Sequence, residues 1–299
     1  LNSAKNARKS LYSGVTTIRE NGPKNKTMLE LRKSIALGQQ IGPRMMLCGR
    51  PISIIGGHMG YFGSQVTGEI QSRAMVRQLT KEGADYIKIT ATGGSTITSD
   101  PLRPAFNLDE LKALTEEAHK FNKLTAAHCT STEGIKLAVQ ADVDMIIHSV
   151  FKEPNGNNKF DNKIAELMAS KGVYVNPTLH VLRAQIWATQ KSMVGKPENK
   201  EDILALDIAK REFERRVNDV NKLIGFGAKV ITGSDSSWGD YQLGNTAYEV
   251  ECLELAGLSR SKSLKSVTSD SAVSIGVDQS VGTLEKGKEA DILVLEKDP

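Results

Sequence analysis

The chain has 299 residues and a net charge of +4, with 39% hydrophobic and 25% charged residues, as is usual for a globular protein. This length is sufficient for an α/β barrel of about 250 residues with a small appendage. The charges are spread out, and no apolar run approaches the roughly 20 residues of a membrane helix, so neither nucleic acid nor a membrane is an expected partner.

The cysteines, Cys48, Cys129 and Cys252, are odd in number and widely spaced, so we expect small buried thiols rather than disulfides. The chain starts at LNSAKNARKS without a methionine and stops at EKDP, and both ends look cut. We expect a cytoplasmic protein; a secreted or periplasmic one stays open because the start of the chain shows no leader but looks incomplete.

Short apolar, β-branched runs alternate with segments of helical periodicity along the chain. The runs predict strands at residues 15–18, 44–49, 86–90, 124–129, 145–150, 173–179 and 230–235. Helices are predicted at residues 1–14, 69–84, 107–122, 131–143, 162–172, 202–228, 245–257 and 259–276. Asn107, with Glu110 three residues later, is a predicted helix N-cap, as is Thr130 or Ser131. This alternation argues for a parallel sheet covered by helices.

The fold class we expect is α/β, a TIM-like (β/α)8 barrel that lacks its first strand. A closed barrel of this type needs eight strands, and the chain offers seven, so the missing strand is expected before Leu1. An open, doubly wound sheet is the alternative. We assign residues 1–276 to an N-terminally incomplete barrel domain. Residues 277–299, which include VGTLEKGKEADILVL, are assigned to part of a small β-sandwich domain.

Four potential metal ligands stand at or near the carboxyl ends of predicted strands: Lys88 in YIKI, His128 in LTAAHC, His148 in MIIHS and Asp235 in VITGSD. In a parallel barrel such residues converge on one rim. The histidines suit zinc or a related ion, or they are core residues bonded to backbone.

Asp235 is a candidate metal ligand and proton acceptor, or a turn cap. Lys88, between two isoleucines, is expected to be buried in the barrel mouth. A buried amine is either paired with a carboxylate or modified, for example by carbon dioxide to a carbamate that bridges metal ions.

The ordered set YIKI, AAHC, IIHS and TGSD resembles the metal-dependent amidohydrolase superfamily, in particular its imidazolonepropionase-related and prolidase-like branch, which includes Xaa-Pro and Xaa-Arg dipeptidases. Further pieces that carry the resemblance are LNSAKNARKSLYSGVTTIRENG, IGPRMMLCGRPISIIGGHMG, GADYIKITATGGS and the tail from SDSAVSIGVDQS to EKDP. The similarity covers essentially the whole chain.

The resemblance implies hydrolysis of an amide or peptide bond in a small polar substrate, such as a dipeptide or cyclic amide, by a metal-bound hydroxide. It implies two divalent ions, most simply zinc, bridged by a carboxylated Lys88. His128 and His148 would bind the second ion, and Asp235 would bind the first and move the proton. Candidate substrate-binding residues are His58, Tyr61, His180 and Arg103; a loop-stabilising role for His58 and a structural role for His180 are the alternatives. A homo-oligomer is a further expectation.

The superfamily carries a His-x-His pair at the end of its first strand, and none of the five histidines here is spaced in that way. Three interpretations therefore stay open: a dinuclear hydrolase of which this chain is a piece, a version with one metal ion in which Lys88 is only ion-paired, and a noncatalytic scaffold that cannot assemble the full metal site.

Overall fold

The structure is a computed structural model that describes residues 2–197, 199–236, 241 and 243–297. Its strands are short and all of their pairings are parallel. They are β1 (Thr17–Glu20), β2 (Arg44–Leu47), β3 (Ser53–Ile54), β4 (Gln65–Val66), β5 (Ile87–Ile89), β6 (Thr125–Cys129), β7 (Met145–His148), β8 (Tyr174–Asn176) and β9 (Lys229–Val230). Each of the seven predicted strand regions overlaps one of these strands, although β1 extends two residues beyond its region and β9 shares only Val230 with its own; β3 and β4 are additional.

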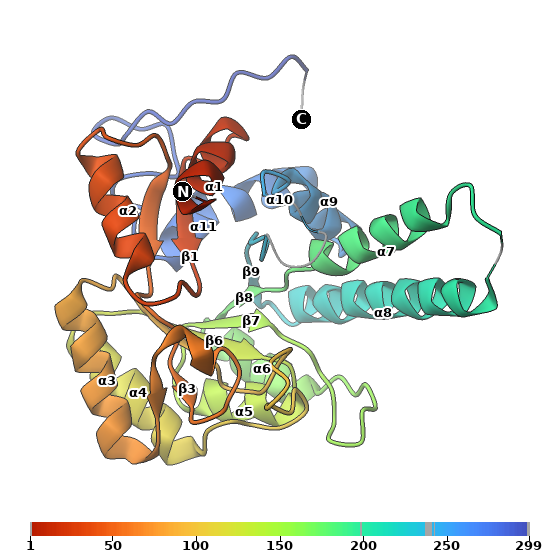
Figure 1. The fold of residues 1–299 in the computed structure, drawn as a ribbon, viewed down its shortest axis with the longest axis horizontal. Coiled ribbons are helices and arrows are strands. Elements are labelled where there is room, and N and C mark those ends of the chain that lie inside the picture. The colour runs from red at the N-terminus through yellow and green to blue at the C-terminus, as the bar shows by residue number, and fades with distance from the viewer. Residues whose placement is uncertain (1, 198, 237–240, 242, 298–299) are drawn as a thin grey trace.

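The helices lie before, between and after the strands. They are α1 (Asn2–Tyr12), α2 (Thr27–Ala36), α3 (Gly68–Glu82), α4 (Leu108–Lys120), α5 (Thr132–Gln140), α6 (Asn162–Ser170), α7 (His180–Met193), α8 (Lys200–Gly225), α9 (Ala247–Leu255), α10 (Arg260–Val267) and α11 (Ser269–Ser274), with a short 3-10 helix at Gly60–Phe62. Helices α3 to α6 cover one side of the sheet, whereas α7 and α8 project from the body as a hairpin (Figure 1).

The order of the strands in the sheet follows their order in the chain. Strands β5 to β9 form one sheet, and β1 pairs with β2. The two groups are joined where Asp85 N donates to Leu47 O at 2.7 Å and Ile52 N donates to Lys88 O at 2.8 Å. Among the residues that the structure describes, β1 and β9 each have a strand neighbour on one side only. The resulting succession is that of a parallel barrel whose two edges are not joined by strand pairing within the described part of the chain.

Alternate side chains along each strand enter different clusters. Ile87, Ile89 and Ile146 are fully buried and belong to the large core between the sheet and its helices. Met145 and Ile147, together with residues of the neighbouring strands, form a smaller cluster on the inner face. Burial on both faces is expected for parallel strands and explains why their sequences are continuously apolar.

The predicted N-caps of α4 and α5 are formed. Asn107 and Glu110 form a capping box at the start of α4. Ser131 rather than Thr130 caps α5, since its side chain accepts from Gly134 N. Cys48, Cys129 and Cys252 are free and buried, as predicted.

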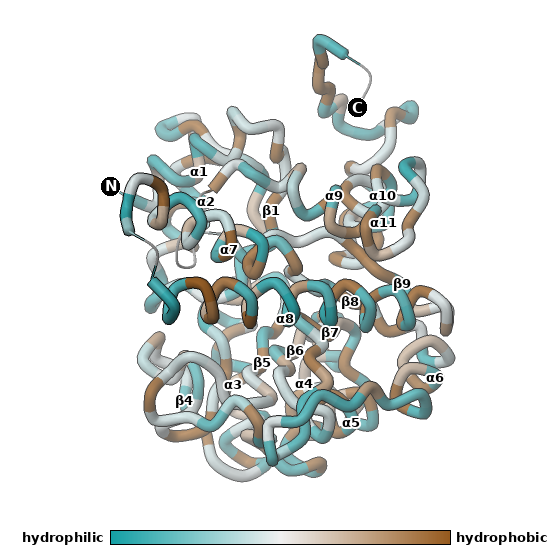
Figure 2. Tube along the Cα trace, turned by 90° about the vertical axis from the view of Figure 1, so that its right-hand side faces the viewer, coloured by the Kyte–Doolittle hydropathy of each residue, from teal (hydrophilic) through white to brown (hydrophobic). Residues whose placement is uncertain are grey.

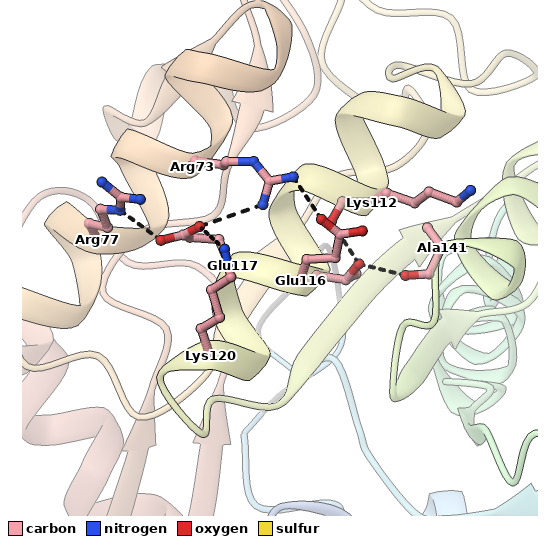
Figure 3. Close-up of polar contacts among 8 residues, drawn as sticks. Arg73, Arg77, Lys112, Glu116, Glu117, Lys120 and Ala141 are labelled. Atoms are coloured by element: carbon pink, nitrogen blue, oxygen red, sulfur yellow. Dashed lines mark hydrogen bonds and ion pairs between the residues drawn. The ribbon is translucent and has the colours of Figure 1, made fainter.

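Helices α3 and α4 are tied together by ion pairs around Glu117, whose side chain is only 2% exposed (Figure 3). Its carboxylate accepts from Arg77 Nε at 2.6 Å, and Arg73 and Lys120 lie at 3.5 and 3.4 Å. Because these two helices lie over β5 and β6, this network fixes the outer layer behind the strands that carry Lys88 and His128.

The segment from residue 277 to residue 297 contains no helix or strand, so the strand expected within 281–295 is not formed. A strand needs a neighbour for its backbone groups, and the described chain supplies none there. Four consecutive apolar side chains are consequently exposed: Ile292, Leu293, Val294 and Leu295. They form a brown stretch near the C-terminus in Figure 2. In the described part of the chain, every helix is too short or too polar to cross a membrane.

Candidate metal and active site

The carboxyl ends of the strands line a cavity of about 1440 Å³. The four predicted ligands all contribute to its wall: Lys88 from β5, His128 from β6, His148 from β7 and Asp235 from the segment after β9. The structure therefore brings together residues that are far apart in sequence. Their roles as metal ligands stay predictions.

Lys88 is 3% exposed and lies between the fully buried Ile87 and Ile89. Desolvation, with a smaller contribution from the charge of Arg19, lowers the pKa of its amine to about 8, and the charge of Asp235 opposes this shift. A lowered pKa increases the fraction of neutral amine at neutral pH, and the neutral form is the one that reacts with carbon dioxide. The environment is thus compatible with the predicted carbamate.

The imidazole rings of His128 and His148 lie with their centroids 4.6 Å apart. His128 Nε2 donates to Gly93 O at 3.0 Å, and His148 Nδ1 lies 2.7 Å from Thr178 Oγ1. Desolvation lowers the pKa of both imidazoles well below its usual value, so both rings are neutral near pH 7. Each ring is oriented through one nitrogen, which is how proteins fix histidines whose other nitrogen binds a metal.

The donor set fits a divalent ion provided that Lys88 is carboxylated. In the part of the chain that the structure describes, no three histidine, cysteine, aspartate or glutamate side chains are grouped closely enough to hold an ion. His128 and His148 supply a neighbouring pair of neutral nitrogens. A carboxylated Lys88 would add the anionic oxygen that this pair lacks.

Asp235 is accessible to solvent and lines the cavity. Packing around its carboxylate nevertheless removes part of its hydration, and this desolvation raises the pKa to about 6, while the charge of Lys88 opposes the increase. A carboxylate that titrates near 6 is ionised at neutral pH and still accepts a proton readily.

His58 lies beside one of the predicted ligands, His128. Its ring centroid is 4.5 Å from that of His128, and its Nδ1 is 3.0 Å from Thr96 Oγ1. Desolvation, with a smaller contribution from the charge of Lys88, lowers the pKa of His58 to about 4. A side chain at Gly94 would collide with this ring, because a Cβ atom there would lie 2.6 Å from it. Tyr61 also lines the cavity and is 59% exposed.

Two predicted substrate-binding residues lie elsewhere. His180 begins α7, is 1% exposed and is not part of the cavity wall. It packs against the rings of Trp187, Tyr241 and Tyr248. Arg103 has a largely exposed side chain that forms an ion pair with Asp100 at 3.1 Å, and it too is absent from the wall.

The cavity also contains charged residues that the sequence interpretation missed. Glu20 ends β1, accepts from Gly22 N at 2.6 Å through Oε1 and has a buried Oε2 without a partner among the described residues. Desolvation raises its pKa to about 7. Its position at the carboxyl end of a strand is a sequence feature that could have identified it as a candidate site residue. Arg216, from α8, also lines the cavity, and nothing in the charged run REFERR distinguishes it.

The chain is similar to several known proteins. Ochratoxinase from Aspergillus niger is 26% identical over 298 residues, which cover 90% of this chain and 58% of the relative, so the chain spans less than two thirds of that protein. The crystal structure of an Xaa-Pro dipeptidase with bound methionine is 27% identical, with a TM-score of 0.80, and the match covers 96% of this chain and 71% of that one.

Two further solved structures have the same fold. A putative prolidase from Bifidobacterium longum is 27% identical, with a TM-score of 0.76 and coverage of 95% of this chain and 68% of that one. A. niger ochratoxinase, at 24% identity, a TM-score of 0.80 and coverage of 99% and 69%, supports the fold alone. These likenesses confirm the predicted barrel-like α/β class. Since the amidohydrolase family model matches residues 2–299, the chain belongs to the amidohydrolase family.

Proposed function

We propose that this protein is a metal-dependent hydrolase that cleaves an amide or peptide C–N bond in a small polar substrate, such as a dipeptide or a cyclic amide. The observation that carries the proposal is the convergence of Lys88, His128, His148 and Asp235 on one cavity. Family membership supports it, as do the named activities of the dipeptidase and ochratoxinase relatives.

His128, His148 and a carboxylated Lys88 would hold one divalent ion, and Lys88 and Asp235 would contribute to a second. Zinc is the ion we propose, because neutral imidazole and anionic oxygen are among its preferred ligands. When bound, such an ion supplies polarisation of the substrate carbonyl and acidification of a water molecule.

Side chains of the protein then transfer the proton and stabilise the negative charge that develops on the substrate. The carboxylate of Asp235 accepts a proton from the attacking water and returns it to the leaving nitrogen. His58, held through Nδ1 by Thr96, is neutral at the working pH and directs its other nitrogen to the substrate oxygen that gains negative charge. Burial of Lys88 and both metal-binding histidines keeps bulk water away from these groups.

The first experiment measures divalent metal per chain by elemental analysis, on protein expressed as these 299 residues and from the complete reading frame. Hydrolysis of dipeptides, including Xaa-Pro substrates, and of cyclic amides is then assayed with the metal-loaded protein. We expect bound metal, activity, and a loss of at least about 100-fold in kcat for Asp235→Asn. Asp202→Asn, an exposed carboxylate outside the cavity lining, is the matched control.

Folded protein that binds no metal in either form, and whose activity is absent with every substrate, would contradict the proposal. The protein would then be a noncatalytic member of its family. One ion per chain beside an unmodified Lys88, seen by mass spectrometry, would select the version with a single metal ion. A homo-oligomer and a cytoplasmic location stay proposals that gel filtration and fractionation would test.

A further inference from the structure

The direction of the His148 side chain does not follow from the alternation of its strand. Met145 and Ile147 belong to the inner cluster, whereas Ile146 belongs to the outer core. The next residue, His148, would by alternation face outward with Ile146. It lines the cavity instead, because the backbone turns at this point: φ is 70° at His148 and 55° at Ser149.

This left-handed backbone requires support from its surroundings. The left-handed conformation costs an L-residue with a side chain about 1–2 kcal/mol, and here two such residues follow one another. Asn176 ends β8 nearby, and after it Thr178 is also left-handed, with φ of 53°. The ends of two neighbouring strands are thus held in an unfavourable conformation beside the predicted metal site.

Arg216 of α8 makes the contacts that connect these two strand ends. Its Nη2 donates to His148 O and, at 3.1 Å, to Pro177 O. Pro177 directly precedes Thr178, whose Oγ1 lies 2.7 Å from His148 Nδ1. Nη2 of Arg216 therefore bonds to the backbone carbonyl of His148 and to that of Pro177, the residue before Thr178. The hydroxyl of Thr178 in turn orients the imidazole of His148.

The buried guanidinium of Arg216 donates to backbone carbonyls rather than to carboxylates. The residue is 5% exposed, and its Nε is buried without a partner among the described residues. The nearby carboxylates are bound by its neighbour: Arg215 pairs with Glu212 at 2.6 Å and with Asp219 at 2.6 Å. A buried cation satisfied by backbone carbonyls is costly to maintain, and packing of α8 alone would be served by an apolar side chain.

We propose that Arg216 is a positioning residue that locks the left-handed ends of β7 and β8 and thereby turns the imidazole of His148 into the cavity. The inference rests on the proposed function only where His148 is treated as a metal ligand. The orientation of the ring itself is a property of the metal-free protein and is testable without metal.

The decisive experiment is long-range ¹H–¹⁵N correlation NMR of the histidine ring nitrogens in metal-free protein at neutral pH, with His148→Gln to assign the signal. Wild type should show His148 as one tautomer, fixed through Nδ1 by Thr178. Arg216→Gln should give a mixture of tautomers or a broadened signal. Arg215→Gln, next in the helix but bonded only to carboxylates, should leave the signal unchanged.

A folded Arg216→Gln protein with the wild-type tautomer of His148 would overturn the inference, whatever its stability. If that variant does not fold, Arg216→Lys takes its place. An ammonium group has several donors but no planar fork, so we expect it to keep the fold and to shift or broaden the His148 signal. An unchanged signal in Arg216→Lys, together with the wild-type metal affinity described next, would also overturn it.

Cobalt(II) titration followed by visible absorption supplies the second readout. Arg216→Gln, or Arg216→Lys if the former does not fold, should weaken cobalt binding by about 10- to 100-fold, as is typical when the partner that orients a ligand is lost. Arg215→Gln should bind cobalt as wild type does. If wild type binds no cobalt, the proposed function fails, and the NMR result alone decides the role of Arg216.

Discussion

The substitution Glu117→Gln should destabilise the protein by about 2 kcal/mol. The carboxylate is 2% exposed and faces three cations, so its removal leaves positive charge without a counter-charge between α3 and α4 (Figure 3). Breaking a fully buried pair costs about 3–5 kcal/mol. Here Arg77 and Lys120 are 62% and 63% exposed and regain water, so the cost falls toward the roughly 1.5–3 kcal/mol of hydrogen bonds to charged groups.

The assay is urea denaturation of wild type, Glu117→Gln and Glu116→Gln. Glu116 is the matched control, because it precedes Glu117 and also binds Arg73, at 2.7 Å, but its side chain is 56% exposed. An exposed pair of this kind contributes about 0–1 kcal/mol. Equal free energies of unfolding for the two variants would refute the reasoning that burial of Glu117 determines the effect.

The destabilisation caused by Glu117→Gln should depend on pH. The hydrogen bond from Arg77 is the main cause that lowers the pKa of Glu117 in the folded protein. Its stabilisation is therefore complete above the unfolded pKa of about 4.3 and is lost as the pH falls through the lower folded value. The difference in unfolding free energy between wild type and Glu117→Gln should be constant near neutral pH and should shrink below about pH 4. A difference that grows in acid would contradict this assignment.

Two further predictions concern packing and solubility. Gly94→Ala should cost about 1–3 kcal/mol in urea denaturation and lower kcat, because the added methyl collides with His58, whereas Gly225→Ala, where nothing lies within 4 Å, should be neutral or slightly stabilising. Val294→Lys should reduce self-association in light scattering without changing stability by more than about 0.5 kcal/mol, because Val294 is 94% exposed within an apolar run; unchanged scattering would exclude this segment as its cause.

The sequence predicts strands β5, β6 and β7 well because they are buried on both faces and read as largely apolar runs. The same property identifies Lys88 and His128, which stand out as the basic side chains of β5 and β6. His148 was found for a partly incidental reason: its position in the strand would point it outward, and only the left-handed turn brings it to the cavity. Backbone turns of this kind are not visible in a hydrophobic pattern.

Helix α7 was missed because tertiary contacts start it. Its first turn has no side-chain cap of its own; instead the buried carboxylate of Glu249, from α9, accepts from Leu179 N at 2.8 Å and His180 N at 2.6 Å. His180 is thereby drawn into the helix and its aromatic surroundings. Arg216 escaped notice for a similar reason, since its partners are backbone carbonyls on other elements.

The sequential order of the strands in the sheet has a consequence for synthesis of the protein. Strands β6, β7, β8 and β9 each pair with the strand made just before, so the sheet grows in the direction in which the ribosome delivers the chain. Lys88, His128 and His148 precede Asp235 in the chain and are therefore synthesised before it. The wall of the cavity is therefore completed only when the last strand of the sheet and the segment after it have been made.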